Sequence, residues 1–334
     1  MRTAQEVLAA FQNVRRAVRN DVYAPHKPLL LLLALGRVQR GLPRLSTFSE
    51  VEPDLKAMLG AFAPASSLSS RHYPFWHLRG DGGRTLWDFS GPEVLTSQPD
   101  GATPNLGELR RPGIQAGLCA DVFDTLAHQP GLLQQVAHQL LEANFPETLH
   151  ADIAAAAGLD LTPVPQVREA SQDAFNTQVR RRRDPAFRQK VMRAYEWRCC
   201  VCGFDLRIGH VPAGLEAAHI QWHHVGGPDI EPNGLSLCAL HHKLFDLGVF
   251  TIEPSEYRVV FSRDALTADR GTGGELRHHG QAMLPPQDPT LKPMPQFLAW
   301  NRDNVFKNLS VNSKLASRAA SCAAFGDADG QSAC

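Results

Sequence analysis

The sequence lacks the features of a membrane-spanning or secreted protein. Its strongest apolar run, Leu29–Leu35, is bounded by a proline and a glycine and is far shorter than the ~20 residues that span a bilayer. The first six residues contain no apolar core of a signal peptide. The 7 cysteines, 4 of them clustered near residue 200–238 and the rest scattered, do not form the framework of a disulfide-rich domain. We therefore expect a cytoplasmic protein with no membrane partner.

The sequence also lacks net charge, with 34 basic and 34 acidic side chains. This balance excludes a polycation, so any contact with nucleic acid must come from local patches. Residues 1–40 and 180–198 are two such basic stretches. Either stretch could be a solvated helix face, but the second adjoins the motifs described below and is predicted to contact backbone phosphates.

A chain of 334 residues is long enough for two domains with separate cores. Apolar spacing predicts helices over residues 3–20, 29–38, 51–62 and 119–145. Asp81-Gly82-Gly83 followed by Thr85–Phe89 predicts a hairpin. Residues 1–150 are therefore predicted to form an α+β domain.

The rest of the chain divides by composition. Residues 151–175 are rich in alanine and then in proline and threonine, which indicates a short helix and a linker. A second domain is predicted over residues 176–310, with a last helix over 295–306. Residues 311–334 are mainly Ser, Ala and Gly without an apolar period, which predicts a disordered tail.

Two short pairs of ligand residues lie in the second domain. Cys199-x-x-Cys202 and Cys238-x-x-His241 have the spacing of a tetrahedral, four-ligand zinc site. The alternative to a zinc site is that these four residues are unrelated Cys and His side chains in a reduced cytosolic core. Cys200, between the first two, is expected to be a packed thiol. We expect a structural zinc ion that supplies folding free energy to a small module.

A second set of residues lies inside and just after these pairs. Residues 215–220 and 233–237 read as strands and 240–247 as a helix, which carry His219, Asn233 and His242. Strand, strand and helix form the ββα-metal unit, and the segment closely resembles the HNH nuclease family, in particular its restriction-enzyme branch. The resemblance implies that His219 is the general base, that Asn233 orients it, and that His242 binds a catalytic Mg²⁺ or Mn²⁺. Phosphodiester hydrolysis needs a base with a pKa near neutrality and a cation beside the phosphate.

One position departs from that family. Many HNH enzymes have a metal-binding carboxylate immediately before the base histidine, where this chain has Ala218. Glu216, one strand period away, is the predicted second metal ligand, with Asp246 as another candidate; a surface carboxylate is the alternative for Glu216. His223 and His224 are further candidates for DNA contact.

Two motifs in the first domain, His26-Lys27-Pro28 and Ser70–Leu78, resemble the sulfur-binding domains of phosphorothioate-dependent (type IV, McrA-like) restriction endonucleases. The resemblance implies an α/β reader of double-stranded DNA whose contact residues are His26, Lys27, Arg71, His72, Tyr73, Pro74 and His77. Sulfur is larger than oxygen and a poor hydrogen-bond acceptor, so an apolar cup from Tyr73 and Pro74 would favour it. That family often has arginine where this chain has Lys27, which removes a bidentate contact. The aromatic segment could instead be core packing.

The sequence thus predicts an α+β protein, with a sulfur-binding reader before a zinc-containing ββα-metal HNH domain. The expected function is a modification-dependent restriction endonuclease that cuts phosphorothioated DNA. One alternative is an HNH nuclease specific for modified cytosine, in which Trp76 and Trp87 would form an aromatic cage. The other is a catalytically silent DNA-binding protein, suggested by Ala218. Cutting both strands would suggest a homodimer.

Overall fold

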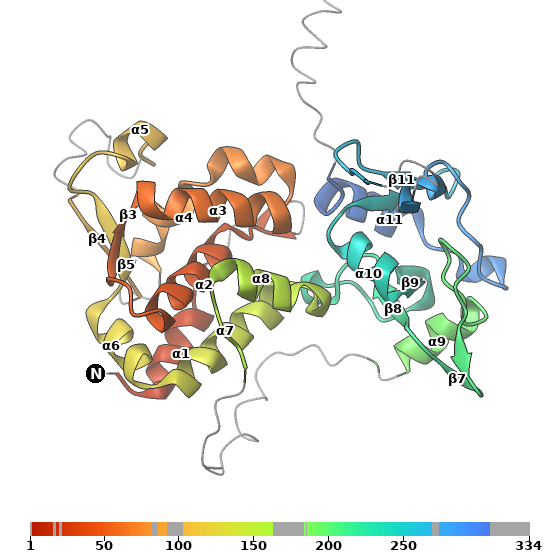
Figure 1. The fold of residues 1–334 in the computed structure, drawn as a ribbon, viewed down its shortest axis with the longest axis horizontal. Coiled ribbons are helices and arrows are strands. Elements are labelled where there is room, and N and C mark those ends of the chain that lie inside the picture. Colours follow the sequence, from red (N-terminus) through yellow and green to blue (C-terminus); the bar gives the residue numbers. More distant parts are fainter. Residues whose placement is uncertain are drawn as a thin grey trace, which may run out of the picture.

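The structure is a computed structural model that describes residues 2–15, 18–19, 22–81, 86–91, 103–162, 184, 186–268 and 274–307. Buried apolar side chains form two separate cores, one drawn from residues 7–159 and the other from residues 187–298. We call residues 2–162 the N-terminal module and residues 184–307 the C-terminal module. Figure 1 shows the two modules side by side, each with both helices and strands. The α+β prediction is confirmed.

Helix α2 (His26–Gln39) forms the centre of the N-terminal module. Its leucine run is buried on every side, as expected for a helix without a polar face. Pro28 lies in the first turn, where its missing N–H is harmless. Helices α1 (Ala4–Gln12), α3 (Phe48–Phe62), α6 (Ala120–His128), α7 (Pro130–Asn144) and α8 (His150–Ala157) complete the helical part. A Cβ at Gly36 would lie 1.9 Å from the carbonyl oxygen of Ala157, so α2 and α8 meet backbone to backbone only because this residue is glycine.

A small antiparallel sheet lies beside these helices, with the order β3 (Leu45–Thr47), β5 (Gln115–Leu118), β4 (Trp87–Ser90). The short elements are β1 (Val18–Arg19), β2 (Val22–Tyr23), α4 (Tyr73–His77) and α5 (Leu106–Leu109). Thr47 caps α3 in a reciprocal capping box with Glu50, which satisfies two backbone N–H groups at the start of that helix.

Three local predictions differ from the structure. The helix predicted over 3–20 ends at Gln12, and Val18–Arg19 forms β1 instead. The hairpin is wrong, because Tyr73–His77 is helical and β4 pairs with β5; Pro74 favours a helix start. The helix predicted over 119–145 is two helices, divided before Pro130.

Several predictions fall outside the described residues. These are the linker beyond residue 162, the basic run Arg180–Arg183 and the tail over 311–334. The helices predicted over 29–38, 51–62 and 295–306 are confirmed. Among the described residues, no helix is long and apolar enough to cross a membrane.

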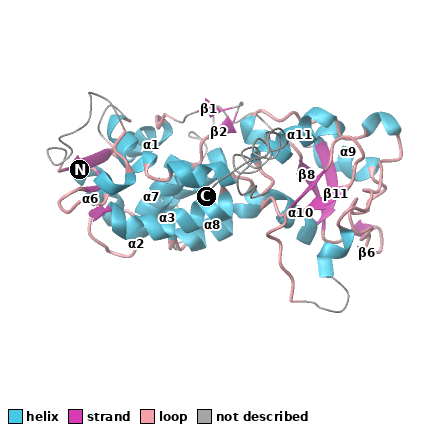
Figure 2. Cartoon of the chain, turned by 90° about the horizontal axis from the view of Figure 1, so that it is seen from above, coloured by secondary structure: helices cyan, strands magenta, loops and turns pink. Residues whose placement is uncertain are grey.

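The C-terminal module is built on a strand, strand and helix unit, as predicted. Strand β8 (Leu215–His219) pairs antiparallel with β9 (Gly234–Cys238), and α10 (Ala239–Asp246) follows directly. Figure 2 shows α9, α10 and α11 gathered with β8 and β11 at one end of the molecule. The other elements are α9 (Phe187–Ala194), β6 (Arg207–Ile208), β7 (Val211–Pro212), β10 (Phe250–Ile252), β11 (Val259–Phe261) and α11 (Pro295–Asn304).

Candidate active site and metal centre

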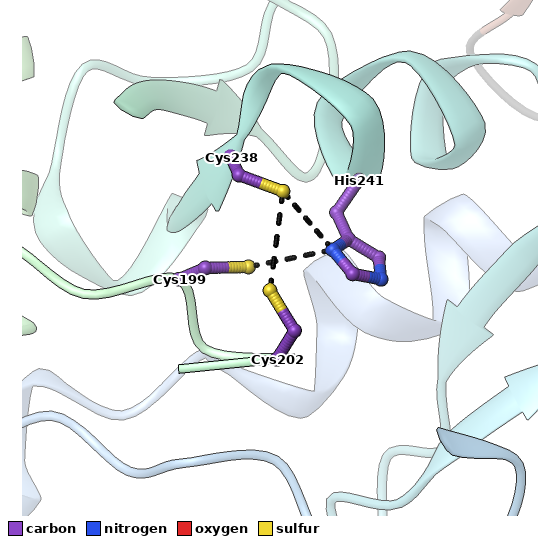
Figure 3. A group of neighbouring side chains, drawn as sticks. All are labelled: Cys199, Cys202, Cys238 and His241. Atoms are coloured by element: carbon purple, nitrogen blue, oxygen red, sulfur yellow. Dashed lines mark hydrogen bonds between the residues drawn. The ribbon is translucent and has the colours of Figure 1, made fainter. Parts of the chain in front are cut away.

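The two predicted pairs of ligand residues converge on one point. The Sγ atoms of Cys199, Cys202 and Cys238 and the Nδ1 atom of His241 lie within 4.8 Å of one another (Figure 3). Cys202 Sγ is 4.0 Å from Cys238 Sγ, and His241 Nδ1 is 3.1 Å from Cys238 Sγ and 3.6 Å from Cys199 Sγ. Tetrahedral zinc with S and N bonds of about 2.3 and 2.0 Å requires separations of about 3.8 and 3.5 Å. The four residues could therefore hold a metal ion.

Local structure explains why these ligands meet. Cys199 and Cys202 lie on a tight turn in which the Gly203 N–H donates to the Cys199 carbonyl, with Gly203 at φ +75°. Cys238 ends β9, and His241 lies in the first turn of α10. Hydrogen bonds from the Cys202 and Cys238 thiols hold the pKa of the Cys199 thiol well below its usual range, which favours the thiolate that a cation binds.

Cys200 is fully buried in the second core, as expected of a packed thiol. A carboxylate that was not predicted stands behind the cluster instead. Glu275 Oε2 lies 3.0 Å from the Nε2 atom of His241, on the side of the ring away from the thiols. Carboxylates in this position commonly fix the tautomer and orientation of metal-binding histidines.

His219 lies at the end of β8. Its ring stacks on Phe187, with centroids 4.0 Å apart and planes 16° apart. His219 Nε2 lies 2.7 Å from Oδ1 of Asp229, and the other oxygen of that carboxylate accepts the Asp184 N–H at 2.6 Å. Burial opposes ionisation of Asp229, but these hydrogen bonds outweigh burial and lower its pKa. Asp229 was not predicted; its only signal was a carboxylate in the Gly-Gly-Pro-Asp loop after the strand.

Asn233 is 0% exposed and ties down the loop that follows His219. Its Oδ1 accepts the Gln221 N–H at 2.8 Å, and its Nδ2 donates to the carbonyls of Gln221 and Pro228 at 3.0 and 2.9 Å. Gly227 lies against both the Gln221 carbonyl and the same amide, since a Cβ there would be 1.9 Å from the Gln221 carbonyl oxygen and 3.0 Å from Asn233 Nδ2. Loop and asparagine therefore form one rigid unit.

His242, on α10, is held between two carboxylates. Its Nδ1 lies 2.6 Å from Glu216 Oε2 and its Nε2 lies 3.3 Å from Asp246 Oδ2. Burial alone would favour the neutral ring, but the two carboxylates raise the pKa of His242 to about 9. Strand β8 carries both His219 and Glu216, so this strand links the two imidazoles. Ala218 is buried in the same strand.

His223 and His224 follow in the short helix His223–Val225. The ring of His223 lies 5.7 Å from that of His219, and its Nε2 is 3.7 Å from Asp229 Oδ2. His224 packs against Trp222, with ring centroids 5.3 Å apart. His223 thus borders the His219 site, close to where DNA contact was predicted for it.

In the N-terminal module, the predicted basic contact residues have protein partners. His26 Nε2 lies 2.9 Å from the Ser67 carbonyl oxygen and 3.0 Å from Ser70 Oγ. The Lys27 ammonium donates to Asp81 at 2.6 Å and to the Arg15 carbonyl at 2.8 Å.

Arg71 donates to Glu52 at 2.8 Å, and the same carboxylate accepts Arg110. The Arg71 guanidinium is thus part of an ion-pair network.

The other predicted contact residues surround an exposed aromatic ring. Tyr73 is 47% exposed, and its ring contacts those of His72 and His77 at centroid distances of 4.7 and 5.9 Å. His77 Nε2 lies 2.7 Å from Thr103 Oγ1, and Pro74 is buried beneath. Burial lowers the pKa of His26, His72 and His77, so these rings are neutral near pH 7.

Two family profiles match the chain. Residues 4–162 match the ScoMcrA-like DNA sulfur-binding domain, and residues 199–253 match an HNH endonuclease profile. No curated protein matches the chain significantly.

Parts of the chain also match solved structures. The sulfur binding domain of ScoMcrA complexed with phosphorothioated DNA is 26% identical, with 48% of this chain and 99% of that chain covered and a TM-score of 0.40. The type IV phosphorothioation-dependent restriction endonuclease ScoMcrA is 26% identical over 46% of this chain and 32% of that chain, with a TM-score of 0.37. The modification-dependent TagI restriction endonuclease is 24% identical over 39% of this chain and 41% of that chain, with a TM-score of 0.29.

Proposed function

We propose that this chain is a modification-dependent restriction enzyme that cuts phosphorothioated duplex DNA. Residues 4–162 match the ScoMcrA-like DNA sulfur-binding domain, and residues 199–253 match an HNH endonuclease. The observation that carries the proposal is the presence of both matched domains in one chain. The domain limits proposed from composition, 1–150 and 176–310, contain most of both matches.

We assign the chemistry to His219 and the residues around it. His219 would take a proton from the attacking water, as a general base whose ring is oriented by Asp229 and by stacking on Phe187. Asn233 would hold the loop after His219 through its three hydrogen bonds. This pairing of imidazole and carboxylate is how an imidazolium is stabilised while the proton is transferred.

His242 and Glu216 would hold the catalytic cation. Glu216 and Asp246 contact opposite nitrogens of the His242 ring, so an ion bound to one nitrogen meets only one of these carboxylates. The Glu216 side is the more open, since this side chain is 45% exposed and that of Asp246 is 3% exposed. DNA phosphate and water can reach that side. Mg²⁺ or Mn²⁺, which prefer oxygen ligands and retain water, suit it and would supply positive charge beside the scissile phosphate.

We assign zinc to Cys199, Cys202, Cys238 and His241, since three sulfurs and one ring nitrogen at tetrahedral spacing are typical of structural zinc sites. The ion would join the turn after α9 to the start of α10, and so fix the helix that carries His242. Its role is to hold the fold rather than to take part in hydrolysis.

We propose that Tyr73 and its neighbours read the modification. The exposed Tyr73 ring, with His72 and His77 against it, offers carbon atoms to a large and poorly hydrated sulfur atom. The Lys27 ammonium is near enough to His77 to add to the effect of burial in lowering the pKa of that ring, so a phosphate beside Tyr73 would meet its positive charge. His26, which is neutral, would contact the DNA backbone by hydrogen bonding. The buried Pro74 would support this surface from beneath, and Arg71 would support it through Glu52 rather than contact DNA directly.

The structure gives little support to recognition of a modified base. Trp76 and Trp87 are buried in the first core, and the Trp87 indole N–H donates to the Phe75 carbonyl. Neither ring is therefore exposed to receive a flipped cytosine. This burial argues against a nuclease specific for modified cytosine.

The test compares phosphorothioated and ordinary plasmid DNA, each incubated with the full chain and Mg²⁺ or Mn²⁺. We expect cutting of the modified plasmid only, none by His219→Ala, and retained binding of modified DNA by that variant. Tyr73→Ala should lose the preference for sulfur in binding assays with matched oligonucleotides. Equal cutting of both plasmids would refute sulfur recognition, and no cutting of either would favour a silent DNA-binding protein.

A further inference from the structure

The C-terminal module rests on the N-terminal module through the helix that carries His242. Helix α10 contacts the short helix Glu147–Leu149, and an ion pair joins it to the first turn of α8. The Lys243 ammonium donates to the Thr148 carbonyl and pairs with the Asp152 carboxylate. On the same helix, the Asp246 carboxylate accepts a hydrogen bond from the Thr148 hydroxyl.

Asp246 is the point at which this contact reaches the candidate active site. The Thr148 hydroxyl donates to Oδ2 of Asp246, and the same oxygen lies 3.3 Å from His242 Nε2. The Trp222 indole N–H donates to Oδ1 at 3.2 Å. A carboxylate that is 3% exposed is stable as a charge only where such donors surround it. One of these donors comes from the other module.

We propose that Thr148 is a positioning residue for the catalytic centre: through Asp246 it fixes the ring of His242 and so sets the affinity of the nuclease site for its divalent cation. This inference rests on the proposed function, in that His242 is taken as a cation ligand. The Thr148 hydroxyl orients Asp246, Asp246 orients the Nε2 side of the ring, and Nδ1 is thereby directed at Glu216. The nuclease site then depends on one hydroxyl that the DNA-reading module supplies to α10.

A second contact between the modules provides a matched control. The Lys307 ammonium, beyond the end of α11, donates to the carbonyls of Gly60 and Ala61. These are carbonyls of the last turn of α3, which otherwise lack helical partners. Lys307 therefore joins the same two modules through other partners. Weakened docking alone should affect Thr148 and Lys307 variants alike.

The experiment measures Mn²⁺ binding to the full chain, with free Mn²⁺ followed by electron paramagnetic resonance. The relevant site is the one lost in His242→Ala. Thr148→Val, which keeps the shape but removes the hydroxyl, should weaken that site by about tenfold to a hundredfold, the usual effect of losing a partner of a metal-binding histidine. Thr148→Ser should restore binding to within about threefold of the wild type, and Lys307→Met should also stay within about threefold.

Cleavage gives a second readout. Raising Mn²⁺ should return the turnover of Thr148→Val toward that of the wild type, with the KM for DNA unchanged. Unchanged Mn²⁺ binding in Thr148→Val would overturn the inference. So would a loss of Mn²⁺ affinity in Lys307→Met equal to that in Thr148→Val, or the absence of a His242-dependent Mn²⁺ site in the wild type. If the wild type binds Mn²⁺ at His242 but does not cut phosphorothioated DNA, the proposed function fails while the role of Thr148 stands.

Discussion

Replacing Asn233 by alanine is the sharpest test of how the loop after His219 is held. The substitution removes three hydrogen bonds from a fully buried amide, those to the Gln221 N–H, the Gln221 carbonyl and the Pro228 carbonyl. At about 1 kcal/mol each, their loss should destabilise the loop by about 3 kcal/mol. A local loss of that size corresponds to an increase of about a hundredfold in the rate of amide exchange.

The matched variant Asn233→Asp separates hydrogen bonding from volume. An aspartate keeps the acceptor for the Gln221 N–H, but it places an oxygen against the two carbonyls that Nδ2 now bonds. Asn233→Asp should therefore destabilise the loop at least as much as alanine, although it is nearly isosteric.

Hydrogen–deuterium exchange of the peptide over residues 220–234 measures both effects, with a peptide from α2 as internal control. Loss of cleavage should accompany the faster exchange, because the loop begins next to His219. Wild-type protection of this peptide in either variant would refute the reasoning.

The remaining predictions concern the metal cluster, the base and pH. Cys202→Ser should reduce the bound zinc, measured by mass spectrometry, and unfold the C-terminal module, because metal binding contributes to its folding free energy; a folded protein with full metal content would contradict this. Asp229→Asn should lower kcat by about tenfold or more while binding of DNA survives, since general base catalysis is worth about 10²–10⁴-fold; an unchanged kcat would remove Asp229 from the mechanism. Burial lowers the pKa of His26 from 6.5 in the folded chain, so below pH 6.5 the unfolded chain binds a proton more readily than the folded one. The free energy of unfolding should therefore fall as the pH is lowered through 6.5. Urea midpoints at successive pH values check this, and His26→Gln should flatten the difference.

The sequence was sufficient where one local pattern determined the outcome. The leucine run predicted α2 because its composition alone shows a segment that is apolar on every face, whatever packs against it. The two pairs of ligand residues predicted a convergent cluster because each pair lies on one tight turn or helix start. The strand, strand and helix unit between Leu215 and Asp246 followed from short apolar runs broken by glycine and proline.

The sequence was insufficient where distant segments meet. Thr148 lies 98 residues from Asp246, and no periodicity relates the two. Asp81, whose carboxylate accepts a hydrogen bond from the Lys27 ammonium, lies 54 residues from Lys27, and no sequence pattern pairs them. The hairpin was predicted from the Asp-Gly-Gly turn signal at residues 81–83, whereas Pro74 and the burial of Phe75 and Trp76 favour a helical turn before it.

The all-round burial of α2 determines which parts of the N-terminal module can be redesigned. His26 and Lys27 occupy its first turn and are half-buried against Ser67 and Asp81. A change at either position must therefore suit its partner, but it leaves the leucines below in place. Substitutions further along the same helix would act on the stability of the whole module instead. Libraries aimed at new specificities should therefore vary the first turn of α2 together with Tyr73 and His77, and leave residues 29–35 constant.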